Sequence, residues 1–126
     1  MRKEAEGWVK IANEEFQSAK YLFEKSLFRM VCYHSQQAVE KILKAILVEH
    51  EVEVPFTHNL IDLNNAVKEF HYETPVSNEE CVFLNSVYRS RYPSDAGLLP
   101  TGEPREDDAR KALVIADTIL NWFNKK

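Results

Sequence analysis

Apolar side chains recur at helical spacing from Met30 to Glu49, and we take this segment as the element around which the chain is organised. No glycine or proline interrupts it. The recurring apolar positions are Val31, Cys32, Ala38, Val39, Ile42, Ala45 and Ile46. Because these positions recur at spacings of three, four and seven residues, as on one face of a helix, the pattern predicts a long helix. Leu43 and Leu47 widen the apolar stripe, so this helix is expected to have neighbours on more than one side.

Polar side chains lie between these apolar positions and gather amide and ammonium groups on one side of the helix. They are Gln36, Gln37, Glu40, Lys41 and Lys44. Glu40 precedes Lys44 by one turn, in the order that stabilises an exposed helix by roughly 0.2–0.5 kcal/mol. Our default interpretation of the two lysines is solvated charge, and contact with a ligand is the alternative.

A second amphipathic helix is predicted over residues 3–25, ahead of the central one. Val9, Ala12, Phe16, Ala19 and Phe23 alternate by three and four residues. Ser26 and Leu27 leave room only for a tight connection, which makes the two helices an antiparallel pair. The chain therefore opens with a helical hairpin.

Two shorter helices are expected next. The run HEVEVP alternates like a strand, but Pro55 ends it and no strand partner is evident, so we interpret it as a loop. Thr57 is the expected cap of a third helix, with Leu60, Leu63, Ala66, Val67 and Phe70 on its apolar face. Ser77 and Glu80 have capping-box spacing and predict the start of a fourth helix.

Residues 91–104 read RYPSDAGLLPTGEP and show no helical periodicity. A last helix follows, with three acids at residues 106–108 in its first turn and Lys125 and Lys126 at its end, as the helix dipole favours. The chain is thus predicted to be all-α, a single domain over residues 1–126. Short connections between about five helices favour an up-and-down bundle.

Composition narrows the class of protein. The 126 residues carry 16 basic and 20 acidic side chains, a net charge of −4, which argues against strong binding to duplex nucleic acid. Cys32 and Cys81 fall within apolar helical patterns and are expected to be buried, reduced thiols. No apolar run approaches the length of a membrane span, and none follows the charged N-terminal residues as in a signal peptide. We expect a cytoplasmic protein.

The stretch YRSRYPSD, at the end of the predicted fourth helix, is the most unusual local feature. Arg89 and Arg91 at a helix C-terminus have a purely structural explanation, because cations offset the helix dipole there. The functional alternative is anion recognition. Arg91 offers a planar fork suited to phosphate, and Tyr92 offers a ring on which a base can stack. Both interpretations stay open on the sequence alone.

Histidines and nucleophiles give weaker signals. His58 is expected to support the third helix, either by capping or by pairing with Asp62, with ligand contact as the alternative. A metal site built from His58, Asp62 and His34 is not expected, and no cofactor is implied. No glycine-rich phosphate loop or Gly-x-Ser-x-Gly motif is present, and neither cysteine lies in a catalytic motif.

Three stretches together resemble the HEPN family, the higher-eukaryote and prokaryote nucleotide-binding domains. They are YHSQQAVEKILKAIL, FTHNL and YRSRYP, and residues 37–41 are the most specific part. The resemblance covers essentially the whole chain. It implies a bundle of about five helices, commonly a homodimer, encoded beside or fused to a minimal nucleotidyltransferase, in some cases within toxin–antitoxin pairs.

HEPN ribonucleases resemble one another in an arginine followed four to six residues later by a histidine in the C-terminal half. The last histidine here is His71, so that motif is missing from its usual place. Arg29 and His34 match the spacing, but they lie at the start of the central helix, and we treat the match as coincidence. They remain the only catalytic candidates, and the resemblance favours the non-ribonuclease branch.

These observations lead to three hypotheses. The first is a homodimeric module without chemistry of its own that binds a nucleotide or similar phosphate-bearing ligand and partners a minimal nucleotidyltransferase. The second is a metal-independent ribonuclease or toxin that uses Arg29 and His34. The third is a helical scaffold that binds only protein, through aromatic residues such as Phe28, Tyr33 and Tyr72. The ligand-binding candidates of the first hypothesis are Arg89, Arg91, Tyr92, His58, Lys44, Lys41 and Gln37.

Overall fold

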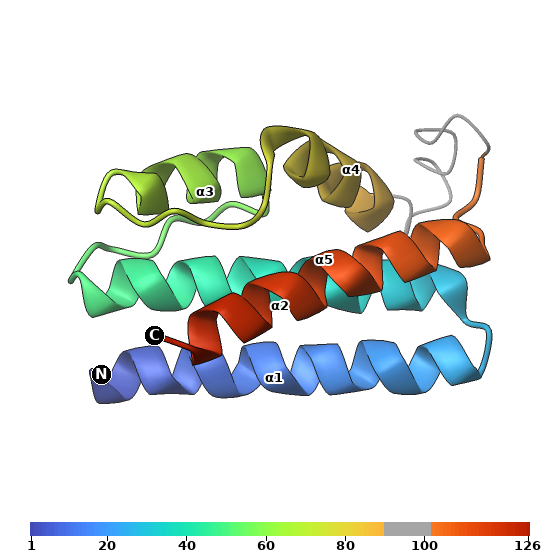
Figure 1. Cartoon of the computed structure of the whole chain (residues 1–126), viewed down its shortest axis with the longest axis horizontal. Coiled ribbons are helices and arrows are strands. Elements are labelled where there is room, and N and C mark those ends of the chain that lie inside the picture. The colour runs from blue at the N-terminus through green and yellow to red at the C-terminus, as the bar shows by residue number, and fades with distance from the viewer. Residues whose placement is uncertain (90–101) are drawn as a thin grey trace.

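A computed structural model describes residues 1–89 and 102–126, which form five helices (Figure 1). Their bounds are α1 Lys3–Glu24, α2 Phe28–Glu49, α3 Leu60–Lys68, α4 Asn78–Arg89 and α5 Glu106–Asn124. The described residues contain no strand, and the segment from Val52 to Pro55 is a loop as expected. The all-α prediction is confirmed. Arg91 and Tyr92 lie outside the described residues.

Helix α2 is the centre of the bundle and packs against each of the other four helices. In Figure 1, α1 lies along one side of α2, α3 and α4 lie along the opposite side, and α5 crosses α2 in front. A tight turn at residues 25–27 joins α1 to α2, as predicted, and Ser26 within it has a φ of 59°. Both chain ends lie at the end of the bundle away from this turn.

All five helices contribute apolar side chains to one core. The longest helices, α1, α2 and α5, each bury apolar side chains completely: Ala12 and Ala19 on α1, Ile42 on α2, and Ala116 and Ile119 on α5 are all 0% exposed. Val9 and Phe23 of the predicted α1 stripe are partly buried. On α2 burial extends almost all the way round the helix from Ser35 to Val48, as expected for a helix with neighbours on several sides. None of the described helices is both long enough and apolar enough to cross a membrane.

The start of α4 has the predicted capping box. The Ser77 hydroxyl accepts from the Glu80 N–H at 3.1 Å, and the Glu80 carboxylate accepts from the Ser77 N–H at 2.9 Å. The prediction for α3 was wrong by two residues. Asn59 caps α3 by accepting from the Ile61 N–H at 3.0 Å, whereas the Thr57 hydroxyl accepts from the Asn59 N–H. Thr57 therefore belongs to the loop before α3, and Asn59 is the cap.

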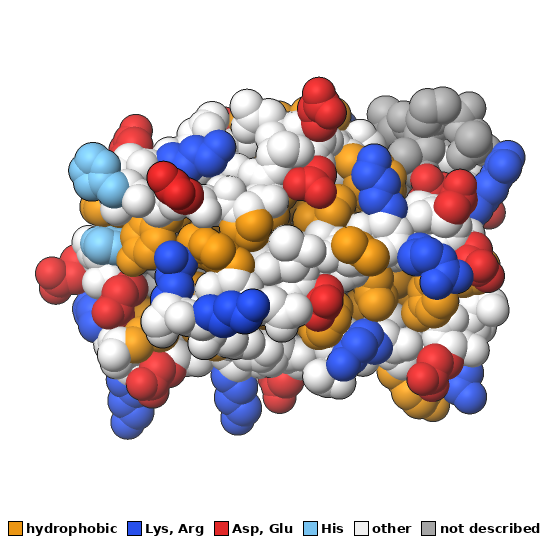
Figure 2. Space-filling model, in the orientation of Figure 1, with side chains coloured by type: hydrophobic (Ala, Val, Ile, Leu, Met, Phe, Trp, Pro, Cys, Tyr) orange, Lys and Arg blue, Asp and Glu red, His pale blue; other side chains and the backbone are white. Residues whose placement is uncertain are grey.

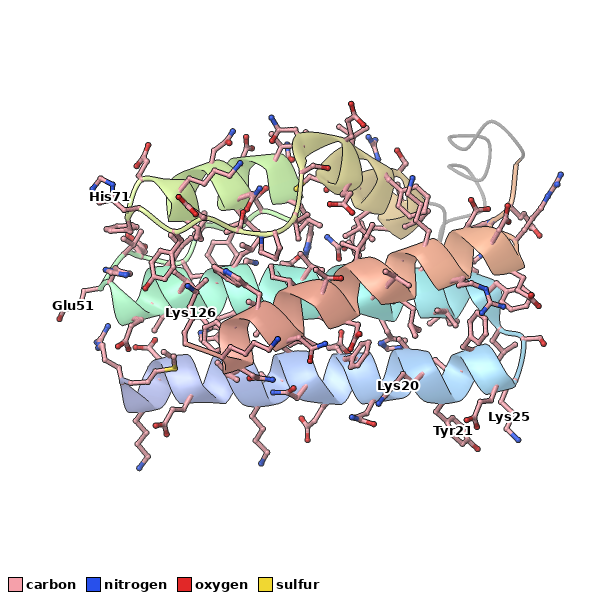
Figure 3. The ribbon with its side chains drawn as sticks, viewed as in Figure 1. Lys20, Tyr21, Lys25, Glu51, His71 and Lys126 are labelled. Carbon is pink, nitrogen blue, oxygen red and sulfur yellow. The ribbon has the colours of Figure 1, made fainter. Side chains whose placement is uncertain are left out.

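Besides Ser26, two left-handed residues lie at the end of the bundle where the chain ends lie. Glu51 follows α2 with a φ of 60°, and His71 follows α3 with a φ of 67°. Figure 3 shows both side chains at that end, whereas Lys25, beside the α1–α2 turn, lies at the other. A positive φ in a residue other than glycine is uncommon, and here it lets the chain reverse direction within a few residues of each helix.

The aromatic residues expected to serve a protein-binding scaffold are packed into the bundle. Phe28 contacts Phe23 with ring centroids 5.9 Å apart, and Tyr33 stacks on Tyr88 at 5.7 Å. The Tyr72 hydroxyl is 2.9 Å from His50 Nε2. These three rings therefore do not form an exposed aromatic surface. Tyr21 and Phe56 are exposed, so the scaffold hypothesis depends on other residues than those predicted. On the face shown in Figure 2, acidic and basic side chains are interspersed, without a continuous basic stripe.

Candidate functional site

A fully buried carboxylate, that of Glu40 in the middle of α2, is the centre of the most unusual polar cluster in the described residues. Its side chain is 0% exposed. One oxygen, Oε1, accepts from His58 Nδ1 at 2.7 Å. The other, Oε2, accepts from Lys41 Nζ at 2.9 Å and from Lys44 Nζ at 3.1 Å. Charged side chains are rarely buried unless they are paired, and Glu40 is paired on both oxygens.

Two glutamines connect this cluster to the loop before α3. Gln36 donates from Nε2 to the His58 backbone carbonyl at 3.0 Å, and Gln37 donates to Gln36 Oε1 at 2.8 Å. Lys41 donates to Gln37 Oε1 at 3.0 Å. The polar side of α2 is therefore one hydrogen-bonded network, and it holds His58 by both its backbone and its ring.

The structure corrects the default interpretation of the α2 lysines as solvated charges. Lys44 is only 6% exposed, and Lys41 is half-buried. Both ammonium groups also lie over the indole of Trp8 on α1, 5.8 Å and 5.9 Å from the ring centroid. The pair of Glu40 and Lys44 is therefore a buried ion pair, in contrast to the exposed helix-surface pair that their spacing predicted.

The pKa of Glu40 reflects these contacts. Burial alone raises the pKa of a carboxyl group, but hydrogen bonds from His58 and Lys41 and the charges of Lys41 and Lys44 outweigh it and hold the pKa of Glu40 below its ordinary value. Glu40 is thus a carboxylate at neutral pH. Two ammonium groups against one carboxylate leave the cluster with a surplus of positive charge.

Acid is expected to remove the stability that Glu40 contributes. Because the pKa is lower in the folded state than in the unfolded chain, this contribution is complete above the ordinary pKa and is lost as the pH falls through the lowered native value. Urea unfolding between about pH 6 and pH 3 should show the free energy of unfolding falling more steeply for the natural chain than for Glu40→Gln. One proton sets an upper limit of about 1.4 kcal/mol per pH unit on the difference in slope.

Glu106→Gln is the control for this titration, because Glu106 forms only an exposed pair with Arg110. The free energy of unfolding of this variant should fall with pH as steeply as that of the natural chain. Equal slopes for the natural chain and Glu40→Gln would contradict the lowered pKa of Glu40.

A pocket of about 270 Å³ opens beside His58, between the start of α3 and the end of α4. Its lining residues are His58, Asn59, Asn85, Tyr88 and Arg89. The His58 ring stacks on Tyr88 with centroids 5.0 Å apart and an interplanar angle of 30°, and Tyr88 stacks in turn on Tyr33 of α2. Rings, amides and a guanidinium group meet here, which are the groups that recognise a base, polar edges and a phosphate.

The two asparagines are held in place by the helices that they connect. Asn85 of α4 accepts from the Leu60 N–H at 3.0 Å and donates to Asn59 Oδ1 at 3.0 Å. Asn59 Oδ1 also accepts from the Ile61 N–H as the cap of α3. One wall of the pocket is therefore rigid, because both amides bind the first turn of α3.

The structure brings several predicted ligand residues together. His58, Lys41, Lys44 and Gln37 share the Glu40 network, and His58 and Arg89 line one pocket. The partner of His58 is Glu40, and so the expected pair with Asp62 was wrong. The sequence interpretation missed Glu40, Asn59, Asn85 and Tyr88 as site residues. A row of polar residues at i, i+4 and i+8 within an otherwise apolar helix, Gln36, Glu40 and Lys44, was the available signal.

The two candidate catalytic residues have separate partners. His34 Nδ1 lies 3.1 Å from the Glu15 carboxylate of α1, and Arg29 pairs with Glu103 ahead of α5. They line two different surface pockets. Within the described part of the chain no group of three or more histidine, cysteine or acidic side chains is arranged to hold a metal ion.

Cys32 and Cys81 are buried free thiols, as predicted. Burial is the main cause that raises the pKa of Cys32 to about 12 and that of Cys81 to about 11. Because the thiolate is the reactive form, neither side chain is suited to nucleophilic catalysis at neutral pH.

Comparison with known proteins identifies the family of this chain. The HEPN domain matches residues 5–126. The chain belongs to the HEPN family. Among curated proteins none matches this HEPN chain. Two solved structures share its fold. TT1696 from Thermus thermophilus has a TM-score of 0.75 and 20% identity, with 98% of each chain covered. ST0689, described as an archaeal HEPN homologue, has a TM-score of 0.68 and 24% identity, with 99% of this chain and 98% of that chain covered.

Proposed function

We propose that this HEPN domain binds a nucleotide in the pocket between α3 and α4. The observation that carries the proposal is the set of groups lining that pocket, His58, Asn59, Asn85, Tyr88 and Arg89. The stacked rings of His58 and Tyr88 provide an edge beside which a base can lie, and the two amides offer donors and acceptors to its polar groups. A pocket of this volume is suited to part of a nucleotide, with the remainder in solvent.

Arg89 is the expected phosphate partner. It is the last residue of α4, it is exposed, and it lines the pocket. A guanidinium group binds phosphate through two parallel hydrogen bonds. The positive surplus of the Glu40 cluster adds a favourable potential for an anion next to His58. Arg91 and Tyr92 follow within three residues in the chain, and the proposal includes them as further contacts to phosphate and base.

The proposed ligand requires no chemistry by the chain itself. We propose that the protein acts in the cytoplasm as a homodimer and as the partner of a minimal nucleotidyltransferase, which the family membership supports. Light scattering of the purified protein tests the dimer. Co-purification with a nucleotidyltransferase encoded next to it tests the partner, and each result can fail without affecting the nucleotide proposal.

Thermal unfolding with a panel of nucleotides tests the binding site. A nucleotide present at about 100 times its dissociation constant should stabilise the natural chain by about 2.7 kcal/mol, on the order of 10 °C in melting temperature for a domain of this size. Arg89→Ala should fold normally and lose most of this shift, because it removes the phosphate contact. Calorimetric titration of the same nucleotide checks the affinity directly.

Arg110→Ala is the matched control for Arg89→Ala. It removes an exposed arginine of α5 that pairs with Glu106 and that lines a different surface pocket. Its nucleotide-induced shift should equal that of the natural chain. An equal loss in both variants would indicate a general charge effect, and no shift with any nucleotide would refute the proposal and favour a scaffold that binds only protein.

A further inference from the structure

We propose that Glu40 is a positioning residue that keeps the ring proton of His58 on Nδ1, so that Nε2 accepts a hydrogen bond from a ligand hydroxyl in the pocket. The ligand half of this proposal rests on the proposed nucleotide site. The half that concerns the tautomer depends only on the described contacts between α2 and the loop before α3.

The first step follows from the chemistry of a carboxylate. An ionised carboxylate only accepts hydrogen bonds, so the 2.7 Å contact between Glu40 Oε1 and His58 Nδ1 requires a proton on Nδ1. The charges around Glu40 keep it ionised, since the pKa of its carboxyl lies below the ordinary value. In a neutral imidazole, the remaining nitrogen then has a lone pair and no proton.

The second step concerns the direction of that lone pair. The backbone of His58 is held by Gln36, and its ring lies against Tyr88. Nδ1 faces the buried carboxylate, and Nε2 is on the far side of the ring from Cγ and Cβ. The side chain is 56% exposed and lines the pocket. Nε2 is thus an acceptor available to a ligand, on a ring that is fixed by three separate contacts.

The third step identifies the chemical class of the ligand group. Phosphate oxygens of a nucleotide at neutral pH are mainly acceptors, so they do not pair with His58 Nε2, which is also an acceptor. Ribose hydroxyls can donate as well as accept, so they match the lone pair of Nε2. They lie between base and phosphate, as His58 lies beside Tyr88 and lines one pocket with Asn59 and Asn85. The geometry therefore favours a ribonucleotide over an analogue without 2′ and 3′ hydroxyls.

Glu40→Gln should invert the tautomer. Lys41 and Lys44 donate to the Oε2 side of Glu40, so a glutamine there is expected to turn its carbonyl oxygen toward the two ammonium groups. Its NH₂ group then takes the place of Oε1 and points a donor at His58 Nδ1. The long contacts of Gln36 and Gln37 Nε2 to Oε1, at 3.5 Å and 3.4 Å, are given up, while both amides keep their shorter bonds. Because a donor requires a lone pair, the His58 proton moves to Nε2, and the acceptor facing the pocket becomes a donor.

Nitrogen-15 NMR of the four histidine side chains tests the proposed tautomer of His58 without any ligand. Spectra are recorded at about pH 9, where histidine side chains in general are neutral, and His58→Gln identifies the His58 signals by their loss. We expect a protonated Nδ1 and an unprotonated Nε2 in the natural chain, and the reverse in Glu40→Gln. A natural chain with the proton of His58 on Nε2 overturns the proposal, whether or not the variant folds.

The chain contains a matched control in a second histidine–carboxylate pair. His34 Nδ1 lies 3.1 Å from Glu15 Oε1, without a lysine on that carboxylate. Glu15→Gln should leave the His58 signals unchanged. If Glu15→Gln shifts the His58 tautomer as strongly as Glu40→Gln does, the effect is not specific to Glu40 and the positioning role is refuted.

Affinity for paired ligands tests the hydroxyl contact. Ribonucleoside monophosphates and their 2′,3′-dideoxy counterparts are titrated into the natural chain. Loss of one hydrogen bond predicts about tenfold weaker binding of the dideoxy ligands. Equal affinities of the natural chain for the two kinds of ligand refute the hydroxyl contact but leave the tautomer unaffected. If no nucleotide binds, the proposed function and this contact both fail, while the spectra still decide the tautomer.

Discussion

Replacing Glu40 by alanine is expected to lower the free energy of unfolding by about 3–5 kcal/mol, on the order of 10–20 °C in melting temperature. The variant leaves Lys44 buried without its anion and removes the acceptor of His58 and Lys41. An uncompensated buried charge is costly because the protein interior solvates it poorly. Urea unfolding monitored by circular dichroism measures the change.

Two companion variants show whether the cost comes from the buried charge. Lys44→Met keeps the carboxylate paired with His58 and Lys41, so its cost should be clearly smaller than that of Glu40→Ala. Glu106→Ala removes a carboxylate that is 62% exposed and should cost less than about 1 kcal/mol. Equal destabilisation by Glu40→Ala and Glu106→Ala would contradict the burial of this cluster.

Ile42→Ala should lower the free energy of unfolding by about 2–5 kcal/mol, because it leaves a cavity in the most densely surrounded helix. Ile42 is 0% exposed and lies on α2, the helix that packs against all four others. The cavity is expected to stay open because α2 is held among four helices, which cannot all move inward. Thermal and urea unfolding should agree on the loss.

Val114→Ala is the control for this cavity. Val114 lies on α5 and is 59% exposed, so its truncation removes little packing, and the expected change is within about 0.5 kcal/mol. If Ile42→Ala were equally mild, Ile42 would not be part of a close-packed core.

Much of the fold was predictable because it depends on local patterns. Helices α1 and α5 are amphipathic, and the capping box of Ser77 and Glu80 needs only four consecutive residues. The start of α3 was harder. Thr57 and Asn59 are both good caps, and what selects Asn59 is its contact with Asn85 on α4, a partner 26 residues away that periodicity does not reveal.

The site was predictable in its residue types but not in its geometry. His58, Lys41, Lys44 and Gln37 were candidates because of their chemistry, yet the group that joins them, Glu40, was interpreted as half of a surface pair. Spacing of i, i+4 describes an exposed helix and a buried one equally well. The packing of α1 and of the loop before α3 against α2 distinguishes them. The loop brings His58 to one oxygen of Glu40, and α1 places Trp8 over the two lysines that pair with the other.

The chain reverses direction so that its first and last residues share one end of the bundle, opposite the α1–α2 turn. A short linker between these ends would close the chain, and a new opening at the exposed residues 25–27 would leave every helix intact. The bundle is thus a suitable subject for circular permutation. In such a permutant α1 and α5 would become consecutive elements, and the polar network of α2 would keep all of its partners.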